Sequence, residues 1–221
     1  MGDLVIITGA SSGLGLALAE NVPFPANVFD VSRSGEPEGP IGHLAADLSA
    51  PGTWAEVGEA LSRLVAEHDP QRAVFIHAAG TLEPIGFAGE VDPGAYTANV
   101  ILNSAAGQVL GHWFLSALHG RSGVFDLVMI SSGAARNIYP GWSSYGAGKA
   151  ALDQWVRNVG AEQRERGNVR VSSIAPGVLA TSMQEQIRET DERDFPEVAR
   201  FHSLHDDGVL VDPEDAARRI W

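Results

Sequence analysis

Hydrophobic and polar positions along the chain form two kinds of segment. Short runs rich in Val and Ile alternate with longer stretches in which apolar residues recur at helical spacing. The short runs predict strands over residues 4–8, 27–32, 43–46, 74–77, 125–131 and 169–174. Because strands that alternate with helices form parallel sheets covered on both faces, we expect an α/β fold with a doubly wound parallel sheet.

Capping signals mark where several of the helices begin. Thr53 and Glu56 have the spacing of a capping box. Asp-Pro pairs at residues 92–93 and 212–213 place a cap before a proline at the first helical position. Helices are accordingly expected to about residue 67 after Thr53, over residues 93–118 and 143–166, and from residue 213 onward.

Composition narrows the range of partners. The chain carries 15 Lys or Arg against 28 Asp or Glu, a net charge of −13 that repels a phosphate backbone, so nucleic acid is not an expected partner. No apolar run approaches the ~18 residues of a membrane span, and Met1-Gly2-Asp3 does not open an export signal. We expect a cytoplasmic protein without a membrane partner. Without cysteine, any redox chemistry must come from a bound cofactor.

Charge is concentrated near the end of the chain. Between Gln184 and Asp215, eleven acidic residues accompany three arginines. This composition fits either a solvated, mobile surface segment or a mobile substrate lid around residues 179–210. No linker or repeat divides the chain, so residues 1–221 are expected to form one domain with this lid. His202, His205, Asp206 and Asp207 have metal-ligand spacing, but on an acidic surface segment we expect solvated side chains and no metal site.

A glycine-rich turn follows the first predicted strand directly. Residues 8–15 read TGASSGLG, and a helical pattern begins at once. Glycines at this junction let the backbone approach a pyrophosphate and aim the helix N–H groups and dipole at it. The turn predicts a dinucleotide site that includes Gly9, Ser11, Ser12, Gly13, Leu14 and Gly15.

The end of the second predicted strand bears on the choice between NAD and NADP. A carboxylate there accepts the ribose hydroxyls of NAD, whereas a 2′-phosphate requires a guanidinium. Asp30 lies closer to the turn than a ribose-binding acid does, and capping or burial explains it equally well. Because Ser32 and Arg33 stand at the strand's tip, we expect NADP rather than NAD. Asp47 and Leu48 are either adenine neighbours or, for the Asp, part of a turn.

The one lysine of the chain, Lys149, lies four residues after Tyr145. On a helix this spacing puts both side chains on one face. A phenol has a pKa near 10, and a nearby ammonium together with a cationic nicotinamide lowers it toward neutrality. Ser132 follows the fifth predicted strand, at the strand end that lines the crevice of an open parallel sheet, and Ser131 is the alternative. Ser132 and Tyr145 are therefore expected to reach one reacting oxygen atom, while Lys149 lowers the tyrosine pKa and holds the ribose hydroxyls of the cofactor.

The TGxxxGxG turn and the YxxxK pair, in this order, resemble the short-chain dehydrogenase/reductase family over residues 4–183. The resemblance implies a Rossmann-type sheet that binds NAD(P), with Ser132, Tyr145 and Lys149 as catalytic residues. It also implies a homodimer or homotetramer, because relatives are often oligomeric.

Further residues take their expected roles from this resemblance alone. Asn99 matches the family member that holds a water in a proton relay. The turn after the fourth strand and the segment that fixes the nicotinamide carboxamide match Ala79, Gly80, Pro176, Gly177, Val178 and Thr181.

Three departures from the family pattern accompany these matches. Residues 77–78 are His-Ala where the family has Asn-Asn, so the Asn that braces the sheet is absent at 78. Ser12 stands where many NADP-binding members have a basic residue. The chain ends at Trp221, inside the helix opened by Pro213, so either the sequence is trimmed or the sheet lacks the family's last strand and has an unusual edge.

The hypothesis that follows is NADP(H)-dependent reduction of a ketone or aldehyde to an alcohol, with Tyr145 as general acid. The alternative is a non-catalytic dinucleotide-binding sensor or scaffold protein. The small-molecule substrate is expected in an apolar slot, by similarity to the sepiapterin and benzil reductase branch. Its candidate lining residues are Leu82, Ile85, Ile138, Trp142, Leu179 and Met183.

Overall fold

Six parallel strands form the central sheet of the computed structural model, which describes residues 2–35 and 40–221. The strand order is β3-β2-β1-β4-β5-β6, and neighbouring strands are all parallel. The expected α/β fold and all six expected strands are confirmed. The strands are β1 (Asp3–Thr8), β2 (Ala26–Ser32), β3 (Gly42–Ala45), β4 (Arg72–His77), β5 (Val124–Ile130) and β6 (Val169–Ile174).

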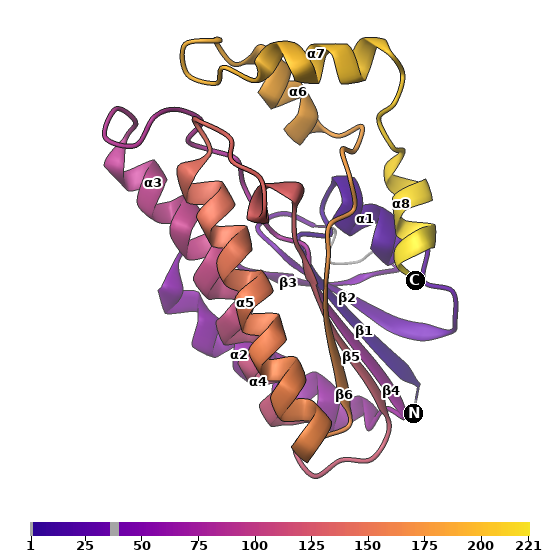
Figure 1. The fold of residues 1–221 in the computed structure, drawn as a ribbon. Coiled ribbons are helices and arrows are strands. Elements are labelled where there is room, and N and C mark those ends of the chain that lie inside the picture. The colour runs from indigo at the N-terminus through magenta and orange to yellow at the C-terminus, as the bar shows by residue number, and fades with distance from the viewer. Residues whose placement is uncertain (1, 36–39) are drawn as a thin grey trace.

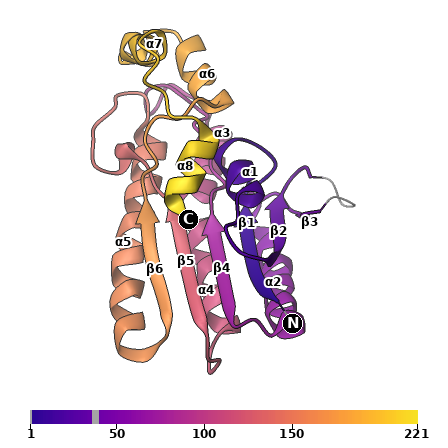
Figure 2. The ribbon, with the colours of Figure 1, turned by 90° about the vertical axis from the view of Figure 1, so that its right-hand side faces the viewer.

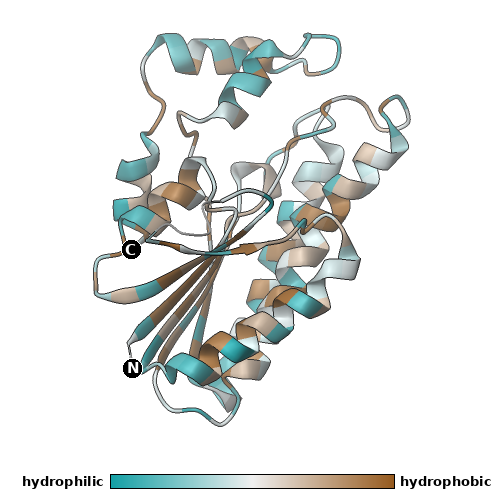
Figure 3. Cartoon of the chain, turned by 180° about the vertical axis from the view of Figure 1, so that it is seen from behind, coloured by the Kyte–Doolittle hydropathy of each residue, from teal (hydrophilic) through white to brown (hydrophobic). Residues whose placement is uncertain are grey.

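Helices cover both faces of this sheet (Figures 1 and 2). On one face lie α2 (Trp54–His68), α4 (Gly107–Ala117) and α5 (Ser143–Arg166). On the other face lie α1 (Gly13–Glu20) and α8 (Pro213–Ile220), which pack against each other. Each face has its own apolar core, and the strands carry hydrophobic residues along their length (Figure 3). Burial of both faces explains why these strands are nearly continuous runs of Val, Ile and Leu.

The chain reverses its direction of travel across the sheet between β1 and β4. In open parallel sheets a crevice forms at this point, at the carboxyl ends of the strands. The strand arrows point toward α6 (Ser182–Glu189) and α7 (Val198–Asp206), which lie beyond those ends (Figure 2). A parallel bridge between Leu179 and Val211 ties together the two chain segments that lead to and from these helices. The acidic segment is therefore folded, and it stands over the crevice.

Two of the three helix caps expected from the sequence form in the structure. Asp92 and Asp212 cap their helices, since their carboxylates accept hydrogen bonds from Ala95 N at 2.7 Å and Glu214 N at 2.8 Å. The capping box at Thr53 does not form, because the Thr53 hydroxyl donates to backbone carbonyls of the preceding turn instead.

The stretch expected as one helix over residues 93–118 is irregular. It comprises α3 (Pro93–Val100), a π-helical segment at Ile101–Ala106, and α4. A π-helical turn inserts extra backbone per turn, so it changes the direction in which the following side chains point.

Two further features of the described residues concern the edges of the sheet and the length of the helices. The sheet has β3 and β6 at its edges, and residues 2–35 and 40–221 contain no seventh strand. None of the helices in these ranges is both long enough and apolar enough to cross a lipid bilayer.

Candidate active site

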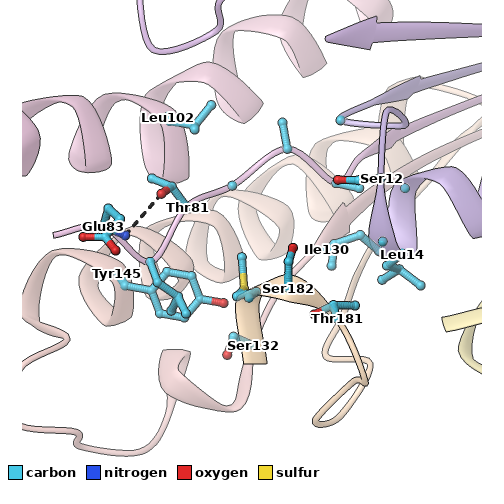
Figure 4. A pocket seen from close by; sticks show the side chains of 18 of the residues that line it. Ser12, Leu14, Thr81, Glu83, Leu102, Ile130, Ser132, Tyr145, Thr181 and Ser182 are labelled. Atoms are coloured by element: carbon cyan, nitrogen blue, oxygen red, sulfur yellow. Dashed lines mark hydrogen bonds between the residues drawn. The ribbon is translucent and has the colours of Figure 1, made fainter. Parts of the chain in front are cut away.

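A cleft of about 760 Å³ lies at the carboxyl ends of the strands, under α6. Its two ends are chemically different (Figure 4). The glycine-turn end is formed by Gly9–Gly15, Ser32–Ser34 and Asp47–Ser49. The tyrosine end is formed by Leu82, Tyr139, Trp142, Tyr145, Met183 and Phe201. Every residue expected to bind cofactor lines this cleft.

The glycine turn has a backbone that other residues do not readily adopt. Gly9 and Gly13 have positive φ angles of 74° and 55°. A Cβ atom on Gly9 would lie 2.8 Å from the Cα of Ala79, so the turn passes directly against the segment after β4. Ser12 precedes α1 without a side-chain cap, which leaves the first N–H groups of the helix without that partner. The turn therefore presents backbone donors and a helix dipole to the cleft.

Asp30 faces away from the cleft and supports the turn from behind. One carboxylate oxygen accepts a hydrogen bond from Ala10 N at 2.8 Å, and the other bonds to the Ser32 hydroxyl and to His43 Nδ1. Burial, one of the two explanations the sequence left open, is thus the observed one. The cleft at this point is lined instead by Ser32 and Arg33.

Asp47 lines the glycine-turn end and also closes a turn. Its Oδ1 accepts hydrogen bonds from the amide and the hydroxyl of Ser49, which lower the pKa of the Asp47 carboxyl. Its position is therefore compatible with both alternatives, a neighbour of the adenine and a residue of a turn.

Ser132, Tyr145 and Lys149 meet at the tyrosine end. Tyr145 and Lys149 lie one turn apart on α5, with the Lys149 Nζ 5.8 Å from the centre of the Tyr145 ring. The Lys149 ammonium donates a hydrogen bond of 2.8 Å to the carbonyl of Ile130, at the end of β5. Ser132 follows this strand and interacts with the Tyr145 hydroxyl. The sequence spacing and the strand order thus bring the three side chains to one place.

Burial dominates the electrostatics of this trio. It raises the pKa of the Tyr145 phenol above its usual value of 10, and the hydrogen bond with Ser132 opposes this only in part. Burial also lowers the pKa of Lys149 to about 8, while the charge of Asp153 opposes the decrease. The expectation that the ammonium lowers the tyrosine pKa does not hold for the protein alone, because desolvation has the larger effect. A phenol with a raised pKa is protonated at neutral pH and is therefore a proton donor.

Asn99 does not reach the cleft. Its amide nitrogen donates to the carbonyls of Glu83 at 2.7 Å and Thr81 at 3.3 Å, so it holds the segment after β4. Asn103, which was not expected from the sequence, donates a hydrogen bond to Asn99 Oδ1 at 2.8 Å and lies near Lys149. A Cβ atom on Gly80 would lie 2.9 Å from Asn103 Oδ1 and 3.5 Å from Lys149 Nζ. Asn103 lies within the π-helical segment, whereas Asn99 lies in α3 before it.

His77 braces the sheet where the expected asparagine is missing. Its Nδ1 forms a 2.8 Å hydrogen bond with the Thr8 hydroxyl, which also accepts a hydrogen bond from Ala79 N at 3.2 Å. These contacts join the ends of β1 and β4 at the crevice. Complete burial lowers the pKa of His77 to about 3, so the ring is neutral at neutral pH. The departure from the family pattern at residues 77–78 is therefore compensated within this chain.

The family model for short chain dehydrogenases matches residues 3–192 of this sequence. The chain belongs to the short-chain dehydrogenase family. It is accordingly an NAD(P)-dependent oxidoreductase, as the resemblance implied.

Individual members of this short-chain dehydrogenase family align over nearly the whole chain. The benzil reductase ((S)-benzoin forming) of Bacillus subtilis is 34% identical, with 96% of this chain and 89% of the relative covered. The sepiapterin reductase of Mus musculus is 32% identical, with 97% and 88% covered. The crystal structure of the enzyme KRED1-Pglu superimposes with a TM-score of 0.82 at 30% identity, covering 97% of this chain and 91% of that one.

The cleft of this short-chain dehydrogenase fits a dinucleotide along its length. The glycine turn presents backbone N–H groups of the kind that bind a pyrophosphate, and a cation, Arg33, lines the same end. Pro176, Gly177, Val178 and Thr181 line the wall beside the tyrosine end, where Thr181 begins α6. That these residues bind the cofactor stays a prediction, and their placement is compatible with it.

The tyrosine end differs from the expected substrate slot in several residues. Leu82, Trp142, Leu179 and Met183 line it, as expected. Ile138 does not, because its side chain is 93% exposed on the loop before α5, and Ile85 packs beside the cleft without lining it. The sequence analysis missed Tyr139, Gln184 and Phe201, which line the cleft from the loop before α5 and from α6 and α7.

The histidines of α7 lie apart from this site. His205 contacts the neighbouring Asp206 at 3.1 Å on the exposed side of the helix. Within the described ranges, no group of three or more His, Asp or Glu side chains is arranged to hold a metal ion.

Proposed function

We propose that the protein reduces the carbonyl group of a small apolar ketone or aldehyde to an alcohol, with NADPH as the cofactor. The observation that carries this proposal is the meeting of Ser132, Tyr145 and Lys149 at one buried end of a cleft whose other end is a dinucleotide-type glycine turn. When bound, NADPH supplies a hydride from the C4 atom of its nicotinamide ring.

Each side chain of the trio has a definite task in this reaction. The Tyr145 hydroxyl donates its proton to the carbonyl oxygen, and burial favours the protonated form that this step requires. The Ser132 hydroxyl donates a hydrogen bond to the same oxygen while negative charge develops on it. Lys149 holds a positive charge beside the phenol and so stabilises the phenolate left after proton transfer. Asn103, rather than Asn99, is the asparagine that borders Lys149.

The position and charge of Arg33 favour NADPH over NADH as the cofactor. Asp30 would repel a 2′-phosphate if it faced the cleft, but its carboxylate is occupied by Ala10, Ser32 and His43. The exposed guanidinium of Arg33 lines the same position and can pair with a phosphate in a charge-assisted hydrogen bond.

The positions of α6 and α7 favour the hypothesis that residues 179–210 form a substrate lid. Met183, Gln184 and Phe201 cover the tyrosine end from above, and the Gln184 amide donates to the Phe201 carbonyl at 3.2 Å. Closure over a substrate would exclude water from the reacting oxygen. The apolar and aromatic lining favours a substrate with bulky hydrophobic groups next to its carbonyl.

The test of this function is Tyr145→Phe, assayed by the loss of NADPH absorbance with a panel of aromatic diketones and ketones. Removal of the acidic proton should lower kcat about 100- to 10,000-fold while NADPH binding is retained. Tyr96→Phe is the matched control, because its hydroxyl bonds to Ser143 outside the cleft and its loss should leave kcat unchanged. An unaltered kcat in the folded Tyr145→Phe variant would contradict the assignment of the acid.

The same assay addresses the non-catalytic alternative. That hypothesis drew support from the missing asparagine at residue 78, but His77 joins β1 to β4 in this chain. A wild-type protein that binds NADPH and consumes none with any carbonyl compound would favour a sensor or scaffold.

A further inference from the structure

Asp153 is a buried acid whose carboxylate has few hydrogen-bond or ion-pair partners. Its side chain is on α5, one turn beyond Lys149, and the residue is 5% exposed. Its Oδ1 has no hydrogen-bond partner among the described residues. Its Oδ2 reaches only the Arg136 guanidinium, at 3.8 Å, and that side chain is 80% exposed. A carboxylate in such a place is costly unless a positive charge lies nearby.

Two cations on α5 lie four residues from Asp153: Arg157, which is exposed, and Lys149, which is buried as Asp153 is. Lys149 is 3% exposed and donates to the carbonyl of Ile130, a neutral partner. Burial alone disfavours the charged form of an amine, and the proposed reaction needs that form beside Tyr145. Residues four apart on a helix lie on one face, and the charge of Asp153 raises the pKa of Lys149.

The other groups around Lys149 do not supply a negative charge. Tyr145, on the same helix, is kept protonated because burial raises its pKa. His77, on β4, is neutral because its pKa is lowered to about 3. The π-helical segment contributes the neutral amide of Asn103, and β5 contributes a carbonyl. Within the described chain, Asp153 is the one negative group that acts on the charge of Lys149.

We propose that Asp153 is a positioning residue whose carboxylate keeps the Lys149 ammonium charged at the tyrosine end of the cleft. Asp153 does not contact the cleft, so it acts only through Lys149. The consequence for catalysis rests on the proposed function, whereas the charge of Lys149 can be measured without any reaction.

The single lysine makes this measurement direct. Protein grown on ¹³C-lysine carries one labelled side chain, so its Cε signal in an NMR titration reports on Lys149 alone. The wild-type midpoint is expected near the pKa of about 8. Asp153→Asn, which is nearly isosteric, should lower this midpoint by about one pH unit. Glu162→Gln is the charge-matched control, since it removes an exposed acid from the same helix and should shift the midpoint by less than about 0.2 units.

Activity provides the second measurement. The alkaline limb of the pH profile of kcat should move down with the lysine midpoint in Asp153→Asn, and Asp153→Glu should restore most of it. Should the Asn variant fail to fold, Asp153→Ser replaces it and the same shift is expected. Equal lysine midpoints in wild type and the folded Asn or Ser variant would overturn the proposal. A wild-type protein without reductase activity would contradict the proposed function, while the NMR comparison would still decide the role of Asp153.

Discussion

The two ends of the cleft differ in whether backbone or side-chain atoms form them. The glycine-turn end consists mainly of backbone, with Gly9 and Gly13 at positive φ and Asp30 bonded behind the turn. The tyrosine end consists of side chains brought from the loop before α5 and from α6 and α7, with Trp142 stacked on Phe195 at 4.5 Å. Backbone geometry leaves little freedom for substitution, whereas an aromatic cluster can repack. We therefore expect the first end to be sensitive to single changes, and the apolar lining of the second, apart from Ser132, Tyr145 and Lys149, to be tolerant.

Among changes outside the catalytic trio, the largest effect is expected from Gly9→Ala. The new methyl group would lie 2.8 Å from the Ala79 Cα, and the φ of 74° is unfavourable for alanine. The affinity for NADPH, measured by fluorescence titration, should fall about 10- to 100-fold, and the free energy of unfolding should decrease by about 1–3 kcal/mol.

Gly52→Ala is the control for this change. Gly52 has open space around the position of a Cβ atom and no positive φ, so neither quantity should change. Equal NADPH affinities in wild type and Gly9→Ala would mean that the close approach of the turn to Ala79 is not needed for binding.

A smaller effect, on cofactor choice, is expected from Arg33→Gln. Loss of the guanidinium should reduce the preference for NADPH over NADH by about tenfold, the value of one charge-assisted hydrogen bond. The ratio of kcat/KM for the two cofactors measures it. Arg63→Gln removes an exposed arginine from α2, away from the cleft, and should leave the ratio unchanged. A ratio that stays at its wild-type value in Arg33→Gln would remove the support for NADPH.

The smallest effect is expected in the apolar lining of the tyrosine end. Met183→Ala should raise KM for the carbonyl substrate about threefold through lost apolar contact, with NADPH affinity unchanged. Ile138→Ala is the informative partner, because the two residues looked alike in the sequence and only Met183 lines the cleft. Ile138 is 93% exposed, so its truncation should not alter KM. A larger effect from Ile138 than from Met183 would contradict the lining described above.

Most features with a local physical cause were predictable from the sequence, although the Thr53 capping box does not form. The glycine turn, the Asp92 and Asp212 caps and the Tyr145–Lys149 pair each depend on residues within one turn of one another. Sequence reasoning failed where the backbone is irregular. Asn103 lies near Lys149 in a π-helical segment, which hydrophobic periodicity does not reveal, while the expected role of Asn99 stays a prediction.

The sequence by itself determined which segments along the chain form strands and which form helices. Their alternation is typical of an α/β fold with a parallel sheet. The sequence also determined the chemistry available, since one lysine, no cysteine and one glycine turn limit the choices. Only the tertiary structure decided that Asp30 supports the turn, that His77 joins β1 to β4, and that Asp153 accompanies Lys149 in a buried site. These outcomes depend on desolvation, which exists only once distant segments have packed together.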